Sequence, residues 1–363
     1  MATTDLDEAR QELRKLVRDF LATVPVRDVL EGRIDSDVVW KRLARELQIF
    51  ELAIPSAPAD EAPGLPELVI VFEELGRALT PGPYLSTLGL GLPALCLTGE
   101  VSLRRVIDRV VAGDAVVAVI DRDHGISADD PHQAPTVSGV AERVMDAPAA
   151  DFLIVPVRSA EGVSLALIDV ESPGVRITAE EPFDPTMRFG RVELSETPVT
   201  RVGDGHPDMS GVLERVETRA RVALAGFHVG LARACVTSAS EYALVRHQFD
   251  RPIGSFQSIK HLLADIHRRT EAAAILTHRA AWAAHHDPDA AALVVHLAAA
   301  EAADAAFESA ASSIQIHGGI GFTWEHDAQL YFKRATAGRM ILGTPDEHRE
   351  AAADLLLRDG VEA

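Results

Sequence analysis

The spacing of apolar residues changes twice along the chain, and this order restricts the possible folds more than any other feature. From Leu6 to about Gly113, apolar residues recur at helical spacing, as in DEARQELRKLVRDFL and LPELVIVFEELGRAL. Between Asp114 and about Val202 they form short runs rich in β-branched residues, such as DFLIVPV and VSLALIDV, separated by turns with Pro and Gly. From Met209 onward the helical spacing returns in long Ala-rich stretches.

This order predicts a mainly α protein with a central β domain. We expect an N-terminal helical domain at 1–113, a middle domain of antiparallel strands at 114–208, and a C-terminal four-helix bundle at 209–363. Strands and helices do not alternate, which argues against a doubly wound nucleotide-binding fold, because parallel strands need crossover helices between them. The long C-terminal helices are expected at Leu213–Arg246, Ser255–Ala284, Ala290–Gln315 and Ala328–Arg339, followed by a short terminal helix.

Composition excludes several classes of partner. The formal net charge of −20, with no Lys- or Arg-rich run, argues against nucleic-acid binding. Only Cys96 and Cys235 occur, far apart, so neither a disulfide framework nor a zinc-type metal site is expected. The N-terminus lacks the apolar core of a secretory signal, and no membrane-spanning segment is expected, so we predict a cytoplasmic protein. Heavy use of Ala and Arg suggests a bacterial source.

One turn between two expected helices carries groups that suit a nucleotide. In residues 242–266, YALVRHQFDRPIGSFQSIKHLLADI, a helix is expected to end near Arg246 and the next to begin near Ser255. Arg246 offers a charged planar fork for a diphosphate, Phe249 an aromatic face for adenine or ribose, and Gln257 amide donors and acceptors. The same residue types also suit a salt-bridged arginine, a core phenylalanine and a surface glutamine, so both interpretations stay open.

A second stretch, SSIQIHGGIGFTWEHDAQLYFKRA at 312–335, contains a glycine-rich break in a helix. Gly318, Gly319 and Gly321 lower helix stability, so another requirement must favour them. Consecutive glycines allow a phosphate or a flavin edge to approach backbone N–H groups closely. The alternative is a turn that only ends the helix.

Together these stretches resemble the flavin-dependent acyl-CoA dehydrogenases, whose patterns read R-x-Q-F-G-x-P-I-x-x-F-Q and then Q-x-x-G-G-x-G. The resemblance extends over the whole chain, including WKRLARELQIFELAIP and FDPTMRFGRVEL. In the family, these segments contact FAD that is bound chiefly by a neighbouring subunit. One position departs from the pattern, because Asp250 stands where the family usually has Gly. The resemblance implies FAD contacts from Arg246, Gln248, Phe249, Phe256, Gln257, Gln315, Gly318 and Gly319.

At the positions where the family carries its catalytic base, this chain has no carboxylate. The family's carboxylate removes the α-proton of an acyl-CoA while the β-hydride passes to flavin. In most members it lies in a Y-E-G-T element, which resembles ILGT here and places Leu342 at the carboxylate position. Other members keep it before an Arg on an earlier helix, where this chain has Ala220 followed by Arg221. Glu217, one helical turn before Ala220, is the nearby substitute, although a solvated glutamate in the charged run ERVETRAR is the alternative. Arg221 itself is a candidate contact for CoA or substrate.

Two further stretches depart from the family. Its T-E-P-x-x-G-S-D element in the β domain corresponds to AVVAVIDRDHGISADD at 115–130, which lacks the Thr, the Pro and the Gly-Ser pair. A Gly-rich turn before the third helix is replaced by SAPADEAPG at 56–64. Residues that usually hold the isoalloxazine ring are therefore missing from the first stretch.

Retained interface segments and missing base positions are typical of a diverged subunit, similar to those paired with catalytic subunits in bacterial steroid-degrading acyl-CoA dehydrogenases. We therefore predict a role in the FAD-dependent α,β-desaturation of an acyl-CoA, as the subunit without the base in an α2β2 heterotetramer. The implied partners are a homologous catalytic subunit, a steroid-derived acyl-CoA and an electron-transfer flavoprotein. Two alternatives stay open: a self-sufficient homo-oligomeric dehydrogenase with a relocated base such as Glu217, and a non-redox scaffold that binds acyl-CoA or a partner protein.

Overall fold

The structure is a computed structural model that describes residues 2–55, 63–121, 126–128, 136–159, 162–202 and 208–361. The chain packs as two compact units. The first contains Met1–Arg33, Pro58–Thr80 and Arg221–Ala363, and the second contains Ile34–Ala57 and Pro81–Ala220. Most of the loop SAPADEAPG, at 56–62, and part of the stretch AVVAVIDRDHGISADD lie outside the described residues.

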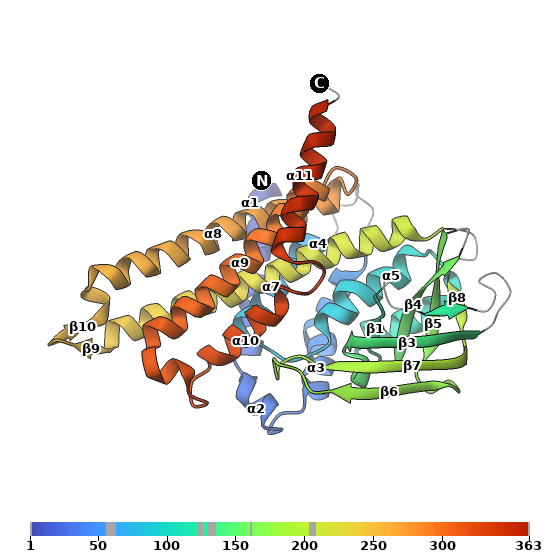
Figure 1. Cartoon of the computed structure of the whole chain (residues 1–363), viewed down its shortest axis with the longest axis horizontal. Coiled ribbons are helices and arrows are strands. Elements are labelled where there is room, and N and C mark those ends of the chain that lie inside the picture. Colours follow the sequence, from blue (N-terminus) through green and yellow to red (C-terminus); the bar gives the residue numbers. More distant parts are fainter. Residues whose placement is uncertain are drawn as a thin grey trace. The chain divides into compact units, whose positions relative to one another are not determined.

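The first unit is helical, apart from one short hairpin (Figure 1). Helix α7 (Ser210–Val245) begins in the second unit and continues into the first from Arg221. The C-terminal helices begin and end within a few residues of the expected positions. The elements of this unit are α1 (Ala2–Leu21), α2 (Val26–Leu30), α4 (Leu65–Ala78), the later part of α7, β9 (His247–Gln248), β10 (Arg251–Pro252), η5 (Ile253–Ser255), α8 (Gln257–His286), α9 (Ala292–His317), η6 (Gly318–Phe322), α10 (Ala328–Gly338) and α11 (Pro345–Val361).

Small side chains fill the core of the C-terminal bundle, where α8 and α9 lie side by side (Figure 1). A buried cluster joins α7, α8 and α9 almost entirely through alanine, with Val229 as the one larger member. Because alanine adds little bulk to a helix surface, the helices can approach closely. The expected C-terminal bundle is confirmed.

Glycines set the crossing of α4 and α7. A Cβ atom added to Gly230 would lie 1.8 Å from the carbonyl oxygen of Glu73, and one added to Gly76 would lie 2.0 Å from that of Phe227. Gly226 is similarly close to Val69, at 3.0 Å from its carbonyl oxygen. Any side chain at Gly230 or Gly76 would therefore push the two helices apart.

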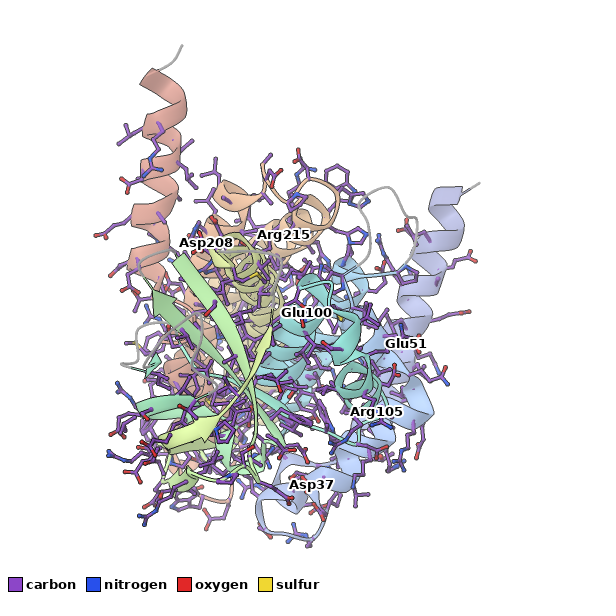
Figure 2. The ribbon with its side chains drawn as sticks, turned by 90° about the vertical axis from the view of Figure 1, so that its right-hand side faces the viewer. Asp37, Glu51, Glu100, Arg105, Asp208 and Arg215 are labelled. Atoms are coloured by element: carbon purple, nitrogen blue, oxygen red, sulfur yellow. The ribbon has the colours of Figure 1, made fainter. Side chains whose placement is uncertain are left out.

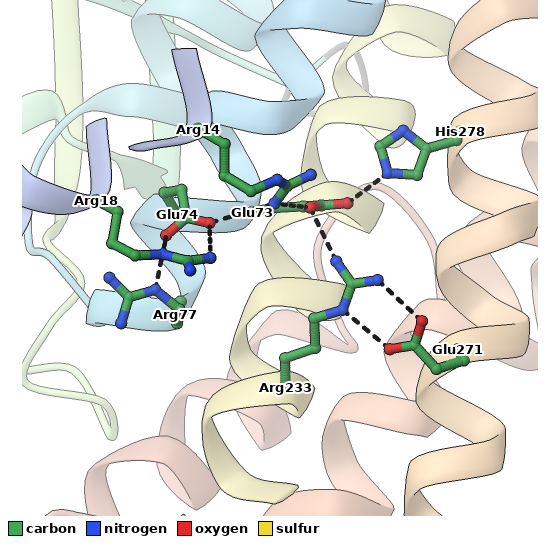
Figure 3. A network of polar contacts seen from close by, with 8 residues as sticks. All are labelled: Arg14, Arg18, Glu73, Glu74, Arg77, Arg233, Glu271 and His278. Carbon is green, nitrogen blue, oxygen red and sulfur yellow. Dashed lines mark hydrogen bonds and ion pairs between the residues drawn. The ribbon is translucent and has the colours of Figure 1, made fainter. Parts of the chain in front are cut away.

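A buried network of charges surrounds Glu73 and Glu74, neighbouring residues of α4 whose side chains are each 1% exposed (Figure 3). Glu73 contacts Arg14 at 2.5 Å, Arg233 at 3.1 Å and Nε2 of His278 at 2.9 Å. Arg233 also donates two hydrogen bonds to Glu271 of α8. The network links α4 to α1, α7 and α8. Glu74 is held by Arg18, Arg77 and Arg14.

The second unit combines helices with strands, and Figure 2 shows the side chains of both. In its core the Trp40 ring packs against Phe50 and Tyr84, with ring centroids 4.2 and 5.8 Å away. The helical elements of this unit are α3 (Ser36–Leu47), η1 (Ile49–Ala53), the π-helical stretch η2 (Tyr84–Gly91), α5 (Leu92–Leu97), η3 (Val101–Leu103), α6 (Arg104–Val111), η4 (Ala147–Ala149) and the start of α7.

Two four-stranded sheets form the β part of the second unit, in the orders β1-β4-β5-β8 and β2-β3-β7-β6. One buried cluster with members such as Leu153, Ile168, Val137 and Val192 comes from strands of both sheets. The strands are β1 (Val117–Val119), β2 (Ser127–Ala128), β3 (Thr136–Met145), β4 (Phe152–Ser159), β5 (Gly162–Asp169), β6 (Val175–Glu180), β7 (Phe189–Pro198) and β8 (Thr200–Val202).

Strand pairing confirms the expected antiparallel β region with one exception. Strand β1 pairs in parallel with β4, so that Val117 lies opposite Phe152. The other pairs in the two sheets are antiparallel, including β4 with β5 and β3 with β7. The helix–strand–helix order of the chain is as predicted, whereas the division into three domains at 1–113, 114–208 and 209–363 stays a prediction.

Among the described residues, helix α7 is the one that is long and apolar enough to cross a membrane by length and composition, and 72% of its most apolar window is buried within the protein. Burial of this kind is ordinary for the central helix of a folded bundle.

Candidate functional site

Both segments singled out from the sequence lie at the same end of the bundle in the first unit. The chain leaves α7 after Val245, forms the β9–β10 hairpin and enters α8, while α9 ends at His317 (Figure 1). Ala243 and Ile316 share a buried cluster against which Ile253 packs. The rings of Tyr242 and His317 lie 4.5 Å apart. Packing between α7 and α9 therefore brings the two segments together.

A tight turn presents Phe249 and Asp250 at the tip of the hairpin. Both residues have left-handed backbone conformations, with φ of 53° and 63°. Gln248 and Arg251 pair across the strands, which leaves a two-residue loop of the type that requires positive φ at both positions. The usual family Gly at position 250 meets this requirement, and Asp is among the side chains that also tolerate it. The local backbone geometry is therefore compatible with Asp250.

Most of the eight predicted FAD contacts are exposed, and only Phe256 is half-buried. Phe249 is 86% exposed and meets the edge of the Phe256 ring, with centroids 6.1 Å apart. The interpretation of Phe249 as a core residue is therefore wrong. Arg246 forms no ion pair with any described carboxylate, so the salt-bridged interpretation is wrong as well.

Exposed apolar side chains surround these polar groups. On α7, Leu244 and Val245 are 70% and 73% exposed, and beyond the glycines Phe322 and Trp324 are 77% and 67% exposed. Large apolar side chains gathered at one end of a protein are typical of a surface that another chain or a ligand covers. This interface end, defined by 244–257 and 315–324, combines apolar contact area with polar groups.

The residues at the interface end fit the chemistry of FAD. Arg246 supplies a guanidinium for a diphosphate, and Phe249 an aromatic face. At Gly318 and Gly319 no atom lies within 4 Å of the position that a Cβ would take, so the backbone is open to close approach. Gly318 also has φ of 64°, which ends α9 in a conformation that favours glycine. Gln257 and Gln315 are exposed beside these groups. That these residues contact FAD stays a prediction.

Leu342 stands where the resemblance predicts the catalytic carboxylate. Leu342 follows α10, has φ of 58° and is half-buried. Its carbonyl oxygen accepts a hydrogen bond from Nε of Arg221 at 3.3 Å. The predicted substrate contact Arg221 is thus held beside the Leu342 backbone in the first unit. Ala220 and Glu217 belong to the second unit, where Ala220 is fully buried and Glu217 is half-buried.

A small cavity beside Leu342 has histidines in its wall. About 10 Å³ of it can hold the centre of a water molecule, which is the space for about one water. Burial, then the nearby charges of Arg334 and Arg339, lower the pKa of His228 to about 3. Burial, His296 and Arg221 lower the pKa of His348 to about 4. Both rings are therefore uncharged at neutral pH. The cavity is lined by Arg221, Leu224, Ala225, His228, Ala299, Ala303, Gly338, Ile341, Leu342, Gly343 and His348.

These histidines did not appear in the sequence-based predictions, and no motif marks them. His296 and His348 are 52 positions apart in the chain, yet their Nδ1 atoms lie 3.0 Å from each other where α11 packs on α9. Only the helix packing brings them together.

Comparison with known proteins agrees with this arrangement. Residues 212–357 match the acyl-CoA dehydrogenase C-terminal domain. The chain is 31% identical to the acyl-CoA dehydrogenase IpdE2 of Mycobacterium tuberculosis, over 94% of this chain and 95% of that protein.

Two solved structures are similar over almost the whole chain. One is a variant of the Tcur3481–Tcur3483 steroid ACAD, with a TM-score of 0.86, 26% identity, and coverage of 98% of this chain and 99% of that one. The other is the ChsE4–ChsE5 complex of Mycobacterium tuberculosis, with a TM-score of 0.85, 27% identity, and coverage of 96% and 97%. Fold, sequence and the matched C-terminal domain agree, and the chain belongs to the acyl-CoA dehydrogenase family.

Proposed function

We propose that this chain is the subunit without the catalytic base in a heteromeric acyl-CoA dehydrogenase, and that it completes an FAD site held mostly by a homologous catalytic subunit. The observation that carries the proposal is the pairing of an exposed, FAD-compatible interface end with a leucine at the base position. A self-sufficient enzyme would need both a complete FAD site and a catalytic base.

The reaction needs two groups, a hydride acceptor and a base. FAD, when bound, accepts the β-hydride of the acyl-CoA, and a carboxylate must take the α-proton. Leu342 cannot accept a proton, and the nearby histidines His228 and His348 face a cavity with room for about one water. What this chain supplies is therefore binding: the Arg246 charge, the Phe249 ring, and open backbone at Gly318 and Gly319 toward FAD.

Similarity to heteromeric relatives supports an α2β2 assembly. ChsE4–ChsE5 is a complex of two named proteins, and the Tcur3481–Tcur3483 protein is described as a steroid ACAD. We extend both features to this chain: a homologous partner subunit, and a steroid-derived acyl-CoA as the substrate of the assembly. An electron-transfer flavoprotein is the proposed electron acceptor.

The test is expression of the chain alone and together with a Glu-bearing acyl-CoA dehydrogenase homologue from the same genome. We expect the chain alone to show no flavin-dependent dye reduction, and the co-purified complex to carry FAD absorbance and activity. Bound FAD with turnover by the lone chain, lost in Glu217→Gln, would instead establish a self-sufficient enzyme. Failure to retain flavin in any pairing would favour the non-redox scaffold.

A variant pair tests the interface residues themselves. Arg246→Gln in the complex should lower FAD occupancy at a fixed protein concentration, because it removes the charge proposed for the diphosphate. Arg268→Gln is the matched control, since Arg268 is an exposed arginine on α8 outside the hairpin. Equal FAD occupancy in Arg246→Gln and Arg268→Gln would contradict the assignment of Arg246.

A further inference from the structure

Helix α8 exposes a row of large side chains, which we call the α8 row. Ile275 and Trp282 are 71% and 46% exposed, and Arg279 and His286 are exposed as well. Their spacing of four, three and four residues places them on one face of the helix. The guanidinium of Arg279 lies 4.8 Å from the centroid of the Trp282 ring, and the Trp282 and His286 rings are stacked with centroids 4.7 Å apart. These contacts order the row in advance, so a partner would have fewer side chains to immobilise.

The α8 row carries an unpaired positive charge in an acidic protein. Arg279 forms no ion pair with any described carboxylate, whereas Arg269 of the same helix pairs with Glu308. The chain as a whole has a net charge of −20. Exposed tryptophan and arginine side chains beside apolar ones are typical of the residues that contribute most to a protein interface. The α8 row therefore fits a partner that presents apolar side chains and carboxylates together.

Helix α11 of the same chain presents this combination. Its first turns are held on α9 by ion pairs such as that of Arg349 with Asp304. Its later turns project from the other helices of the first unit (Figures 1 and 2). There Leu357 is 67% exposed, and Glu350 and Asp354 are exposed on the same face at spacings of four and three residues. In the described part of the chain neither carboxylate pairs with a cation. We call these three residues the α11 row.

We propose that the α8 row of one copy of this chain binds the α11 row of a second copy. Within one copy both rows stay exposed, so they do not cover each other. In a two-fold dimer the contact is made twice, because α11 of the first copy also meets α8 of the second. In an antiparallel pairing with Leu357 opposite Ile275, a rise of about 1.5 Å per residue places Asp354 and Glu350 within about 5 Å of Arg279 along the helix axis. Opposite charges and apolar side chains then meet in the same register.

This contact lies outside the interface end at 244–257 and 315–324, and it does not depend on FAD. In the proposed α2β2 assembly it would join the two copies of this chain. The occupant is therefore a second copy and not the homologous catalytic subunit.

Sedimentation velocity of the purified full-length chain, over a series of concentrations at pH 7, tests the proposal. We expect a concentration-dependent dimer. Arg279→Glu should weaken it by about 100-fold, because a tenfold loss at one contact is repeated by the two-fold axis. The double variant Glu350→Arg with Asp354→Arg should weaken it similarly. Arg105→Glu is the matched control, because Arg105 is an exposed arginine on α6 and the change alters the net charge equally (Figure 2).

Mixing the two kinds of variant gives the decisive result. Each variant alone places like charges at both contacts, whereas a mixed dimer has opposite charges at both. We therefore expect an equimolar mixture of Arg279→Glu with the double variant to regain the dimer that neither forms alone. Circular dichroism of each variant establishes that it is folded.

Three results would overturn the proposal. The first is a chain that stays monomeric at every concentration. The second is a dimer that Arg279→Glu leaves as stable as Arg105→Glu does, since another surface would then hold it. The third is a mixture that stays monomeric. Arg246→Gln should leave the dimer unchanged, so this proposal and the proposed FAD role can fail separately.

Discussion

Replacing Glu73 with glutamine should destabilise the first unit strongly, because the change removes one charge from the centre of a buried network (Figure 3). Glu73→Gln keeps the shape of the side chain but leaves Arg14 and Arg233 facing a neutral amide. Breaking a buried ion pair by removing one partner costs about 3–5 kcal/mol. We expect the lower end, about 3 kcal/mol, because the side chains of Arg14 and Arg233 are 26% and 32% exposed.

Arg233 also retains its second partner, Glu271, which limits the loss. The measurement is the free energy of unfolding at pH 7 from urea denaturation followed by circular dichroism, with attention to an unchanged slope against urea. The control is Glu46→Gln, which breaks an exposed pair with Arg42 and should leave the unfolding free energy unchanged within error.

The same variant carries a pH signature. Burial alone would raise the pKa of Glu73, but the contact with His278 and the charges of Arg14 and Arg233 outweigh it and hold the pKa below its ordinary value of 4.5. A carboxylate whose pKa is lower in the folded state contributes stability above its unfolded pKa and loses it as pH falls through the folded pKa. The difference between the natural chain and Glu73→Gln should therefore be full at pH 7 and shrink below about pH 4.5. A loss under about 1 kcal/mol at pH 7, well below the range for a broken buried pair, or a difference that does not change with acid, would refute this reasoning.

Further changes test other features. Gly230→Ala should cost about 3 kcal/mol or more, comparable to severe core overpacking, because its Cβ would meet the Glu73 carbonyl at 1.8 Å. Gly211→Ala, in the first turn of α7, has open space and should cost nothing or stabilise by up to about 1 kcal/mol in the same urea experiment. Equal costs would contradict the close crossing of α4 and α7. Asp250→Gly should relieve backbone strain of about 1 kcal/mol at the hairpin tip, visible as slower hydrogen exchange of the hairpin amides; faster exchange would show that the Asp250 side chain stabilises the turn instead.

The helical spacing of apolar residues, together with the joints that contain Pro and Gly, predicted the C-terminal helices well. The expected helix Ala290–Gln315 is observed as Ala292–His317, and Ala328–Arg339 as Ala328–Gly338. The parallel pairing of Val117–Val119 with β4 was not predictable in the same way. A short apolar run does not encode the direction of its neighbour, which depends on how distant parts of the chain pack.

Side-chain environments were harder to predict than elements. The run ERVETRAR suggests a solvated helix face, yet within it Arg219 is 8% exposed and Ala220 is fully buried. Val216, four residues before Ala220 and on the same face of the helix, is also buried. The spacing of these two apolar residues therefore indicated a buried face, but the many charged residues in the run favoured a solvated one. The residues predicted to contact FAD were chosen by resemblance to the family. Their exposure could not be predicted in that way, because it depends on where α7 and α9 end in the folded chain.

The exposure of the predicted FAD contacts and the backbone strain at the hairpin tip together favour a chain that works in association with another subunit. Phe249 is a bulky residue with φ of 53°, a conformation that costs about 1–2 kcal/mol for an ordinary residue. It is also 86% exposed, and its edge contact with the Phe256 ring leaves most of its apolar surface uncovered. Backbone strain of this kind is found at binding sites, where it holds the chain in the conformation that the bound state needs. If another subunit and FAD cover the Phe249 ring, together with Phe322 and Trp324, burial of their apolar area supplies the missing stabilisation. In the proposed assembly the hairpin would already have the shape that the shared site requires, and the partner would remove the proton, because Leu342 cannot accept one.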